Sequence, residues 1–427
     1  MTSILRTLRL SLRFGFGFGF SLSLAAAKTN TTTAAATLYA THYSTQSIHT
    51  LSLARASNGS YTLTETSSLE TCGTYPSWIT LDAETGTIYC SDEDGWRNGN
   101  ETANGSLTAL EVGEGGVLSE VAVTGSAPGS GVYNVVYEGE QGEKFLAVAH
   151  YSGSALSTYA LPLEENADPL QVFDFELSAP GTIPDRQEAP HPHQAFLDPT
   201  GAFVIVPDLG ADLVRVFAID KANGELSTCP SLNYTLGGGP RHGVFWTAAE
   251  DGQARVRGRR RAPRASAGTV LYVAGELNGE LEAFAVSYPA SGCLAFEQIQ
   301  AEVPYPEELP EGASLGEIRL AGSNVYVSIR ADANFDGNDS LAKLSLAQDG
   351  SVEFEEITSA YGVLPRTFEI NKAGDLVAVG NQISSNVAIV ERDPATGALG
   401  NIVANLLVGV PGEPNTLEGL SSIIWDE

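Results

Sequence analysis

Arginine and histidine residues gather where apolar segments of this chain begin. The segment RQEAPHPHQAF contains Arg186, His191 and His193. A second segment, GGGPRHGVF, contains Arg241 and His242. The planar guanidinium of arginine can hold a carboxylate or a phosphate through two parallel hydrogen bonds, and histidine exchanges a proton near neutral pH. Together, these residue types indicate a pocket that binds a small anion and transfers protons.

Further charged and amide side chains stand at the ends of apolar runs. Glu276 follows the apolar run of LYVAGEL, and Arg330 ends NVYVSIR. Arg366 lies in LPRTFEI, and VAVGNQISS contains Asn381 and Gln382. A glutamate near arginines and histidines could take part in acid/base chemistry, because burial and neighbouring charges readily change its pKa. Each residue taken singly could instead only tie neighbouring strands together.

A repeated unit supplies the elements that must position these residues. PHQAFLDPTGAFVIVPDLGADLVRVFAID, from Pro192, is echoed by PRTFEINKAGDLVAVGNQISSNVAIVERD, from Pro365. Both predict an apolar strand, a turn, a Val-rich strand and a third alternating strand. Weaker copies bring the number of units to six, which start at residues 76, 133, 192, 240, 316 and 365. One small sheet cannot bury both of its faces, so such units must stack on their neighbours.

The two ends of the repeat region resemble parts of a seventh unit. TLYATHYSTQSIHTLSL, from Thr37, lacks a first strand, and GLSSIIWDE, from Gly419, could supply it. The 45 Gly and 21 Pro residues, and the lack of a sustained helical period, favour an all-β fold. We therefore predict that residues 28–427 form a single seven-bladed β-propeller, closed by pairing of the N- and C-terminal strands. Two unrelated β-sandwiches would leave the shared turn pattern unexplained.

In a propeller, the strand ends of successive blades converge at one end of a central channel. The charged residues named above share that position, so we expect them to line one pocket. His191 and His193 are separated by one residue and point to opposite faces of an extended segment, so they do not suit one metal ion. We expect one of these imidazoles to face the channel and the other to hold its loop by a hydrogen bond.

Residues 1–27 have the order of a secretory signal peptide. Three arginines precede the apolar run FGFGFGFSLSLAAA, and Ala25 to Ala27 offer a cleavage site. A mitochondrial transit peptide is the alternative, because the segment has no acidic residue and several serines. Secretion is also favoured by six Asn-x-Ser/Thr sequons, at Asn30, Asn58, Asn100, Asn104, Asn233 and Asn338. We therefore expect a secreted protein with no membrane association once the leader is removed.

The four cysteines are compatible with two disulfides. Cys72 and Cys90 flank a strand-turn-strand segment and could pair locally, and Cys229 and Cys293 would then pair across a blade. Four buried thiols are the alternative. Neither spacing is typical of a zinc site.

The chain is strongly acidic, with a formal net charge of −29. This charge argues against binding nucleic acid or an anionic membrane surface. The segment QARVRGRRRAPRASAG, from Gln253, is an exception with six arginines between Arg255 and Arg264. A basic loop could bind a polyanion, but we expect a solvated, disordered insertion at about residues 250–267.

The motifs HPHQAFLDPTGAFVIVPDLGADLVRVF, GPRHGVF, LYVAGEL and GVLPRTFEI resemble the seven-bladed propeller lactonase family. This family includes propeller 6-phosphogluconolactonases and fungal carboxy-cis,cis-muconate cyclases, and the resemblance runs from about Tyr39 to the C-terminus. It implies a catalytic set of His193, Arg241, Glu276 and Arg330 and a reaction without a metal or organic cofactor. The chain departs from the family in reading SIR at Arg330, where relatives commonly carry SNR.

The resemblance and the residues together predict a lactonase or lactonising cyclase that acts on a small carboxylate-bearing or sugar lactone. Arg241 and Arg330 would clamp a carboxylate or the developing oxyanion, while His193 and Glu276 would act as general acid and base. Substrate-binding residues are expected to be His191, Arg186, His242, Arg366 and Gln382. If His193 and Glu276 cannot reach one ligand-sized volume, this hypothesis fails.

Two other functions remain open from the sequence. The first is a non-catalytic secreted propeller that binds a small anionic ligand or a protein partner. The second is a calcium-dependent lactonase, suggested by Asp332, Asp336 and Asp339 in ADANFDGND. That segment lacks the spacing and bidentate glutamate of an EF-hand, so a solvated turn is favoured. The sequence leaves the substrate, the direction of the reaction and the oligomeric state unknown.

Overall fold

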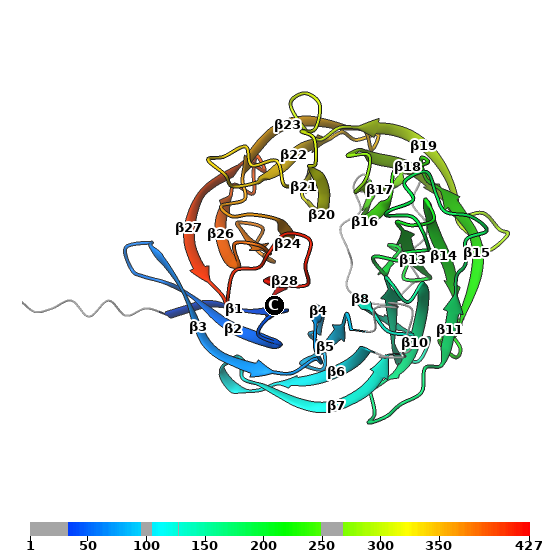
Figure 1. Ribbon diagram of the computed structural model, residues 1–427, viewed down its shortest axis with the longest axis horizontal. Coiled ribbons are helices and arrows are strands. Elements are labelled where there is room, and N and C mark those ends of the chain that lie inside the picture. Colours follow the sequence, from blue (N-terminus) through cyan, green and yellow to red (C-terminus); the bar gives the residue numbers. More distant parts are fainter. Residues whose placement is uncertain (1–32, 95–104, 127, 249–267) are drawn as a thin grey trace, which may run out of the picture.

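Seven antiparallel sheets of four strands each stand around a ring in the computed structural model of the protein (Figure 1). The structure describes residues 33–94, 105–126, 128–248 and 268–427. The expected leader at 1–27, the arginine-rich insertion and the sequons at Asn30, Asn100 and Asn104 lie outside the described residues. The arrangement confirms the prediction of an all-β, seven-bladed propeller.

Each blade runs outward from the channel through four strands. The inner strands are β4 (Pro76–Asp82), β8 (Gly131–Glu138), β12 (Phe196–Leu197), β16 (Pro240–Thr247), β20 (Ser314–Ala321), β24 (Pro365–Ile370) and β28 (Leu420–Trp425). The second strands are β5 (Thr87–Asp92), β9 (Lys144–His150), β13 (Phe203–Asp208), β17 (Thr269–Gly275), β21 (Asn324–Arg330), β25 (Leu376–Asn381) and β1 (Thr33–His42).

The third and fourth strands of each sheet complete the blade on the outside of the ring. The third strands are β6 (Gly105–Val112), β10 (Ala155–Leu161), β14 (Leu213–Ile219), β18 (Leu281–Ser287), β22 (Ser340–Leu346), β26 (Asn386–Arg392) and β2 (Ser47–Arg55). The outer strands are β7 (Leu118–Ser126), β11 (Gln171–Asp174), β15 (Leu226–Asn233), β19 (Ala295–Glu302), β23 (Val352–Ser359), β27 (Leu399–Leu407) and β3 (Tyr61–Glu70). Helix in the described residues is limited to one 3-10 turn at Glu114–Gly116, and no helix there is long and apolar enough to cross a membrane.

Burial along the strands explains why the chain folds into stacked blades. Strands β17 (TVLYVAG) and β21 (NVYVSIR) are buried at every residue, because both faces of a middle strand touch neighbouring blades. The outer strand β15 (LSTCPSLN) is exposed at four of its eight residues. The apolar side chains form clusters between adjacent blades, as where Leu51 of β2 and Val387 of β26 share one cluster. The core is therefore a ring of blade-to-blade contacts.

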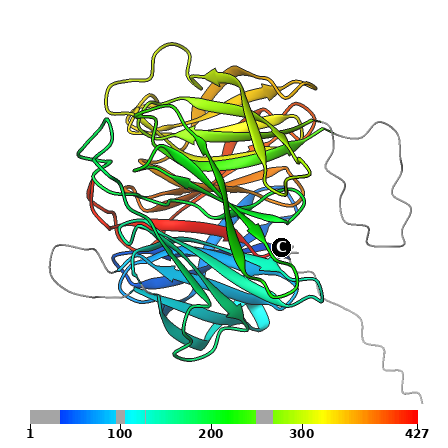
Figure 2. The ribbon, with the colours of Figure 1, turned by 90° about the vertical axis from the view of Figure 1, so that its right-hand side faces the viewer.

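Strand β28 closes the ring by pairing with β1. Leu38 lies opposite Trp425 and Ala40 lies opposite Ile423 in this antiparallel pair. In Figures 1 and 2 the red C-terminal strand lies beside the blue N-terminal strands. The predicted closure by the two ends of the repeat region is confirmed.

One inner strand is shorter than the repeat predicts. The third unit was expected to begin a strand at Pro192, but regular pairing is limited to Phe196 and Leu197. Pro192 forms only an isolated bridge with Asp208. Proline has no N–H group to donate, so the ladder is interrupted there. The segment before β12 is thus an extended loop at the channel mouth.

Both expected disulfides are present. Cys72, which follows β3, is bonded to Cys90 of β5. Cys229 of β15 is bonded to Cys293, which precedes β19. Each bond therefore joins two neighbouring blades. The two disulfides add covalent links to blade boundaries that also carry hydrogen bonds, such as the one from Tyr288 to Asp198 at 3.0 Å.

Candidate active site

A polar pocket opens at the end of the channel where the inner strands begin. It encloses about 770 Å³. The predicted site residues on its wall are Arg186, His193, Glu276, Arg330, Arg366 and Gln382. His193 and Glu276 therefore reach one ligand-sized volume, which is the condition that the sequence set for an enzyme.

Backbone irregularities at the start of the inner strands direct several of these side chains. In β16 the register shift leaves Arg241 as the extra residue of a bulge, and in β24 the extra residue is Arg366. His193 occupies the equivalent place, between the bridge at Pro192 and the start of β12. A bulge bends its strand and turns the extra side chain to a new direction. The same device in three blades gathers their polar side chains at the channel mouth.

Residues at the ends of the second strands form the other half of the wall. Glu276 follows β17, Arg330 ends β21 and Gln382 follows β25. Glu93 follows β5 and Tyr151 follows β9, and both also line the pocket. Neither was among the predicted residues. Their shared position after a buried second strand was the signal that could have identified them.

Glu276 is held by three guanidinium groups. Its Oε1 atom lies 2.5 Å from Arg186 Nη2, and its Oε2 atom lies 3.0 Å from Arg241 Nε and 2.9 Å from Arg330 Nη2. Burial alone would raise the pKa of Glu276, but the three cations, Arg330 foremost, hold it well below its usual range. The carboxylate therefore stays ionised near neutral pH and cannot supply a proton. Of the expected pair, Glu276 is therefore excluded as the general acid.

Arg241 lies behind the pocket wall. Its side chain is 1% exposed, and Nη1 donates to the carbonyl oxygen of Gly316 at 3.0 Å. Arg241 is not among the described residues that line the pocket. The expected direct clamp on substrate is therefore corrected for this residue, whose buried guanidinium lies 3.0 Å from Glu276, a residue that does line the pocket. Arg330 and Arg366 reach the wall in its place.

Arg366 belongs to a second ion pair on the opposite side of the pocket. Its Nη2 atom lies 3.4 Å from Glu93 Oε2. The same oxygen accepts hydrogen bonds from the hydroxyls of Tyr43 at 2.5 Å and Ser77 at 2.8 Å. Glu93 is thus satisfied mainly by neutral donors, which leaves the charge of Arg366 only loosely paired. This guanidinium is well placed to attract an anion.

Two predicted binding residues hold loops. His191 Nδ1 lies 3.0 Å from the carbonyl oxygen of Tyr151, and its Nε2 lies 3.0 Å from Glu188 Oε1. Both ring nitrogens are engaged, and His191 is off the pocket wall. The expected division of the histidine pair is confirmed, with His193 facing the pocket. Gln382 lines the pocket, but its amide nitrogen donates to the carbonyl oxygen of Thr416 at 3.3 Å.

His242 lies beneath His193 rather than at the pocket wall. Its Nε2 atom is 3.2 Å from His193 Nδ1, and its Nδ1 atom is 3.0 Å from Glu317 Oε1. Burial, together with Arg241 and other nearby cations, holds the pKa of both imidazoles well below 6.5. Both rings are therefore neutral at physiological pH. The expected contact of His242 with substrate is corrected to a contact with His193.

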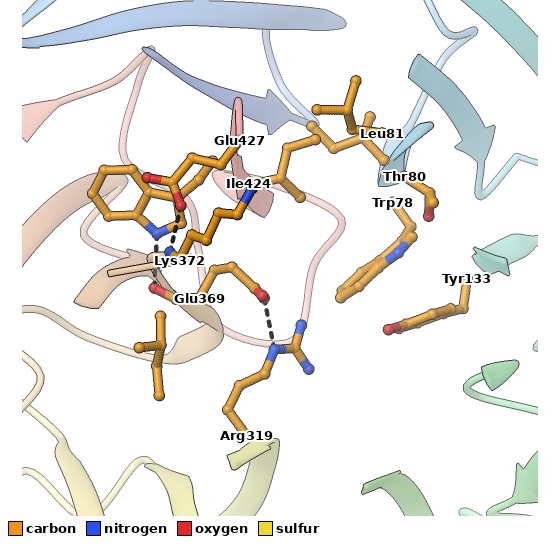
Figure 3. A pocket seen from close by; sticks show the side chains of 12 residues that line it. Trp78, Thr80, Leu81, Tyr133, Arg319, Glu369, Lys372, Ile424 and Glu427 are labelled. Carbon is orange, nitrogen blue, oxygen red and sulfur yellow. Dashed lines mark hydrogen bonds and ion pairs between the residues drawn. The ribbon is translucent and has the colours of Figure 1, made fainter. Parts of the chain in front are cut away.

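The channel has a second pocket at the end where the inner strands finish (Figure 3). This pocket encloses about 510 Å³. Trp78 and Tyr133 stack with ring centroids 3.9 Å apart, and Arg319 Nε donates to Glu369 Oε2 at 2.6 Å. Arg319 also reaches Glu317, so charged groups continue from one pocket toward the other. None of the predicted site residues lies on the wall of this second pocket.

The acidic loop considered for calcium has internal partners for two of its carboxylates. Asp339 accepts the backbone N–H groups of Ala333 and Leu364. Asp332 accepts the hydroxyls of Tyr305 at 3.2 Å and Ser340 at 2.5 Å. Across residues 33–94, 105–126, 128–248 and 268–427, no three His, Cys, Asp or Glu side chains gather as metal ligands would. These contacts give the loop acids a structural use.

The family whose sequence model is described as "Lactonase, 7-bladed beta-propeller" matches residues 37–414. A protein of Arthroderma benhamiae named probable 6-phosphogluconolactonase is 30% identical over 328 residues, which cover 75% of either chain. The 6-phosphogluconolactonase of Bacillus subtilis is 27% identical over 276 residues, covering 64% of this chain and 69% of its own.

Two solved structures share the fold. A periplasmic gluconolactonase of Pseudomonas aeruginosa superposes with a TM-score of 0.67 at 23% identity, covering 91% of this chain and 98% of its own. A putative 6-phosphogluconolactonase of Bacteroides uniformis gives a TM-score of 0.70 at 20% identity, covering 91% and 99%. At this identity the likeness establishes the arrangement of blades.

Proposed function

Since the chain belongs to the seven-bladed β-propeller lactonase family, we propose that it hydrolyses a small sugar lactone in the pocket lined by His193 and Glu276. The observation that carries this proposal is the excess of positive charge there. Arg186, Arg330 and Arg366 line the pocket against two carboxylates, in a chain whose net charge is −29. Such a local positive field attracts an anionic substrate and stabilises an oxyanion.

His193 is the proposed general base. Its Nδ1 atom is occupied by His242, so Nε2 is the nitrogen left for a water molecule in the pocket. Nε2 would take one proton from water while the water oxygen bonds to the lactone carbonyl carbon. The carbonyl oxygen becomes an oxyanion. The protonated imidazole then gives its proton to the ring oxygen as the carbon–oxygen bond of the lactone breaks, which restores neutral His193.

Arg330 and Arg366 are the proposed donors to the oxyanion and to the carboxylate product. Both lie on the pocket wall and come from neighbouring blades. Arg186 is the most exposed of the three, with 43% of its side chain accessible, and suits an anionic substituent on the substrate. A phosphate on the sugar would use this group, since guanidinium binds phosphate through paired hydrogen bonds. Glu276 contacts Arg186 and Arg330, and so holds these two guanidiniums in place on the pocket wall.

The experiment is a hydrolysis assay of the purified protein on a panel of lactones. The panel contains glucono-δ-lactone, its 6-phosphate and a muconolactone, and acid release is followed above the spontaneous rate. A muconate is assayed beside them for ring closure. His193→Gln should lower kcat by about 10²- to 10⁴-fold. Arg55→Ala is the control, because Arg55 is exposed and stacks on Tyr61 far from the channel mouth.

The outcomes separate the competing functions. Turnover of a sugar lactone that depends on His193 supports the proposal. Ring closure of a muconate without hydrolysis would replace it with a lactonising cyclase. Saturable binding of a sugar acid with no turnover of any lactone would replace it with a non-catalytic, ligand-binding propeller.

We also propose that the protein is exported and that residues 1–27 are removed. The two disulfides support export, because such bonds persist in oxidising compartments. Asn58 and Asn233 are exposed and remain available for glycosylation, whereas the Asn338 amide donates to the carbonyl oxygen of Phe335. N-terminal sequencing and deglycosylation of protein from the culture medium would test this. Recovery of unglycosylated protein from mitochondria would contradict it.

A further inference from the structure

We propose that Glu317 and His242 are positioning residues that fix the proton of His193 on Nδ1 and so keep its Nε2 atom free for the pocket. The three side chains form one line of buried hydrogen bonds beneath the pocket. This inference rests on the proposed function for its catalytic consequence. The arrangement of protons itself can be tested without any activity.

The direction of the line is set at Glu317. Its Oε1 atom receives Arg319 Nη1 at 2.6 Å and the backbone N–H of Ile318 at 3.0 Å. Both of these groups can only donate, so Oε1 acts as an acceptor. His242 Nδ1, at 3.0 Å from the same oxygen, must therefore carry a proton. The Glu317 backbone N–H donates to Ser328 Oγ at 2.8 Å, which holds the glutamate in place.

The next proton lies between the two imidazoles. His242 Nε2 and His193 Nδ1 lie 3.2 Å apart, and a hydrogen bond between them requires a proton on one of the two nitrogens. A proton on His242 Nε2 would make that ring an imidazolium, since its Nδ1 is already protonated. Burial and four cations oppose this charge and hold the pKa of His242 well below 6.5; the cations are Arg241, Arg319, Arg366 and Arg330. The proton therefore belongs to His193 Nδ1, and the tautomer of each ring follows from its partner.

His193 has the same kind of surroundings. Burial, Arg241, His242 and Arg366 lower its pKa, and only Glu276 raises it. The ring is therefore neutral, and with Nδ1 protonated its Nε2 carries a lone pair. The edge of His193 also meets the ring of Tyr151, with centroids 5.5 Å apart. The imidazole presents an acceptor, not a donor, to a bound water molecule.

Aromatic rings fix the orientation of His242. Its ring stands edge-on to Trp78 and Tyr133, with centroids 5.9 and 5.3 Å away and interplanar angles of 87° and 89°. His193 and His242 are themselves 5.1 Å apart at 70°. His242 is 2% exposed, so rotation would require these neighbours to move. The rigid packing keeps both nitrogens in line with their partners.

The line also provides for the charge that forms during the reaction. When Nε2 of His193 takes a proton from water, the proton on its Nδ1 can move to Nε2 of His242. The positive charge then lies next to Glu317, whose Oε1 already accepts the hydrogen bond from Nδ1 of that ring. Both protons return when His193 protonates the ring oxygen of the leaving group. No proton is lost in the cycle, and the positive charge on His242 is offset by Glu317, which lies 3.0 Å from its Nδ1 atom.

Nitrogen NMR of protein labelled with ¹⁵N-histidine tests the proton positions directly. The wild-type spectrum should show His193 and His242 as neutral Nδ1–H tautomers, each assigned by its loss in His193→Gln or His242→Gln. The Nε2–H form of His193 would overturn the proposal. This measurement stands whether or not the protein hydrolyses a lactone, so it separates the failure of this inference from the failure of the proposed function.

The kinetic test is Glu317→Gln. It should lower kcat by at least about tenfold with KM nearly unchanged. The acid limb of the kcat/KM profile should move to lower pH, because the imidazolium loses its nearby negative charge. Glu282→Gln is the matched control, since Glu282 is a buried glutamate in β18 whose Oε2 accepts Gln298 away from the pocket. Equal effects of the two variants on kcat and on the pH profile would overturn the positioning role.

Discussion

Glu276 is the carboxylate on which the charge balance of the channel mouth depends. It contacts three guanidiniums that differ greatly in burial, since the side chain of Arg241 is 1% exposed and that of Arg186 is 43% exposed. An exposed ion pair contributes little to stability, whereas breaking a buried one leaves an uncompensated charge without water. The contact of Glu276 with Arg241 is thus structural, whereas its contact with Arg186 is accessible to a ligand.

This difference predicts unequal effects of two arginine substitutions. Arg241→Met should lower the free energy of unfolding by about 3–5 kcal/mol, because it leaves part of Glu276 unpaired in the protein interior. Arg186→Met should change it by less than about 1 kcal/mol. Urea unfolding of both variants measures the two values. Equal losses would mean that burial does not decide the strength of these pairs.

Neutral buried histidines make stability depend on pH. Burial lowers the pKa of His150 and of His42 from 6.5 to about 4. The unfolded chain therefore binds more protons than the folded chain between these values, and the free energy of unfolding decreases as the pH falls through this window. His150→Gln should show a shallower decrease than the wild type, measured by urea unfolding from pH 7 to pH 4. Parallel curves would contradict the prediction.

At the scale of elements, the start of each inner strand decides where a side chain points. The sequence predicts that Arg241 and His193 share a position in their repeats, and the bulges in β16 and before β12 confirm that. The sequence could not predict how deeply each side chain is buried, because Arg241 is buried against Glu276 only after β17 has folded beside β16. Glu93 and Tyr151 were not predicted from the sequence. Other acidic and aromatic residues surround them there, so their residue type alone did not mark them as site residues.

The disulfide between β15 and the turn before β19 fastens two neighbouring blades. It closes a loop of 64 residues, whereas the bond between Cys72 and Cys90 closes one of 18. Replacing Cys229 and Cys293 with alanine should lower the free energy of unfolding by about 2–4 kcal/mol, because the unfolded chain gains freedom. Denaturant unfolding without reductant measures the loss. An unchanged midpoint and slope would show that blade packing alone holds this boundary.

For the whole molecule, the repeat made the ring predictable, because seven units that cannot bury their own faces have few ways to stack. The shared turn pattern and the two incomplete units at the ends were sufficient for the blade number and the closure. The short β12 was not predictable from the pattern, since the effect of Pro192 on hydrogen bonding competes with the apolar residues that follow it.

The closing strand predicts a test of cooperativity. Deleting residues from Gly419 onward removes β28, which pairs with β1 and whose Trp425 donates to the carbonyl oxygen of Glu369 in the next blade. The truncated chain should lose its cooperative unfolding transition and elute as larger species in size-exclusion chromatography, because an open sheet edge recruits other chains. A monomer with an unchanged transition would contradict this.

The position of β28 in the chain also sets the order in which the protein can be completed. Six whole blades precede it on the ribosome, and β1 emerges long before its inner neighbour exists. During synthesis the seventh blade is therefore a three-stranded fragment with one backbone edge exposed. A nascent chain must protect that edge, or it can accept the closing strand of another copy and form a swapped dimer. The pairing of β28 with β1 closes the finished ring, and it can form only after the rest of the chain has been synthesised.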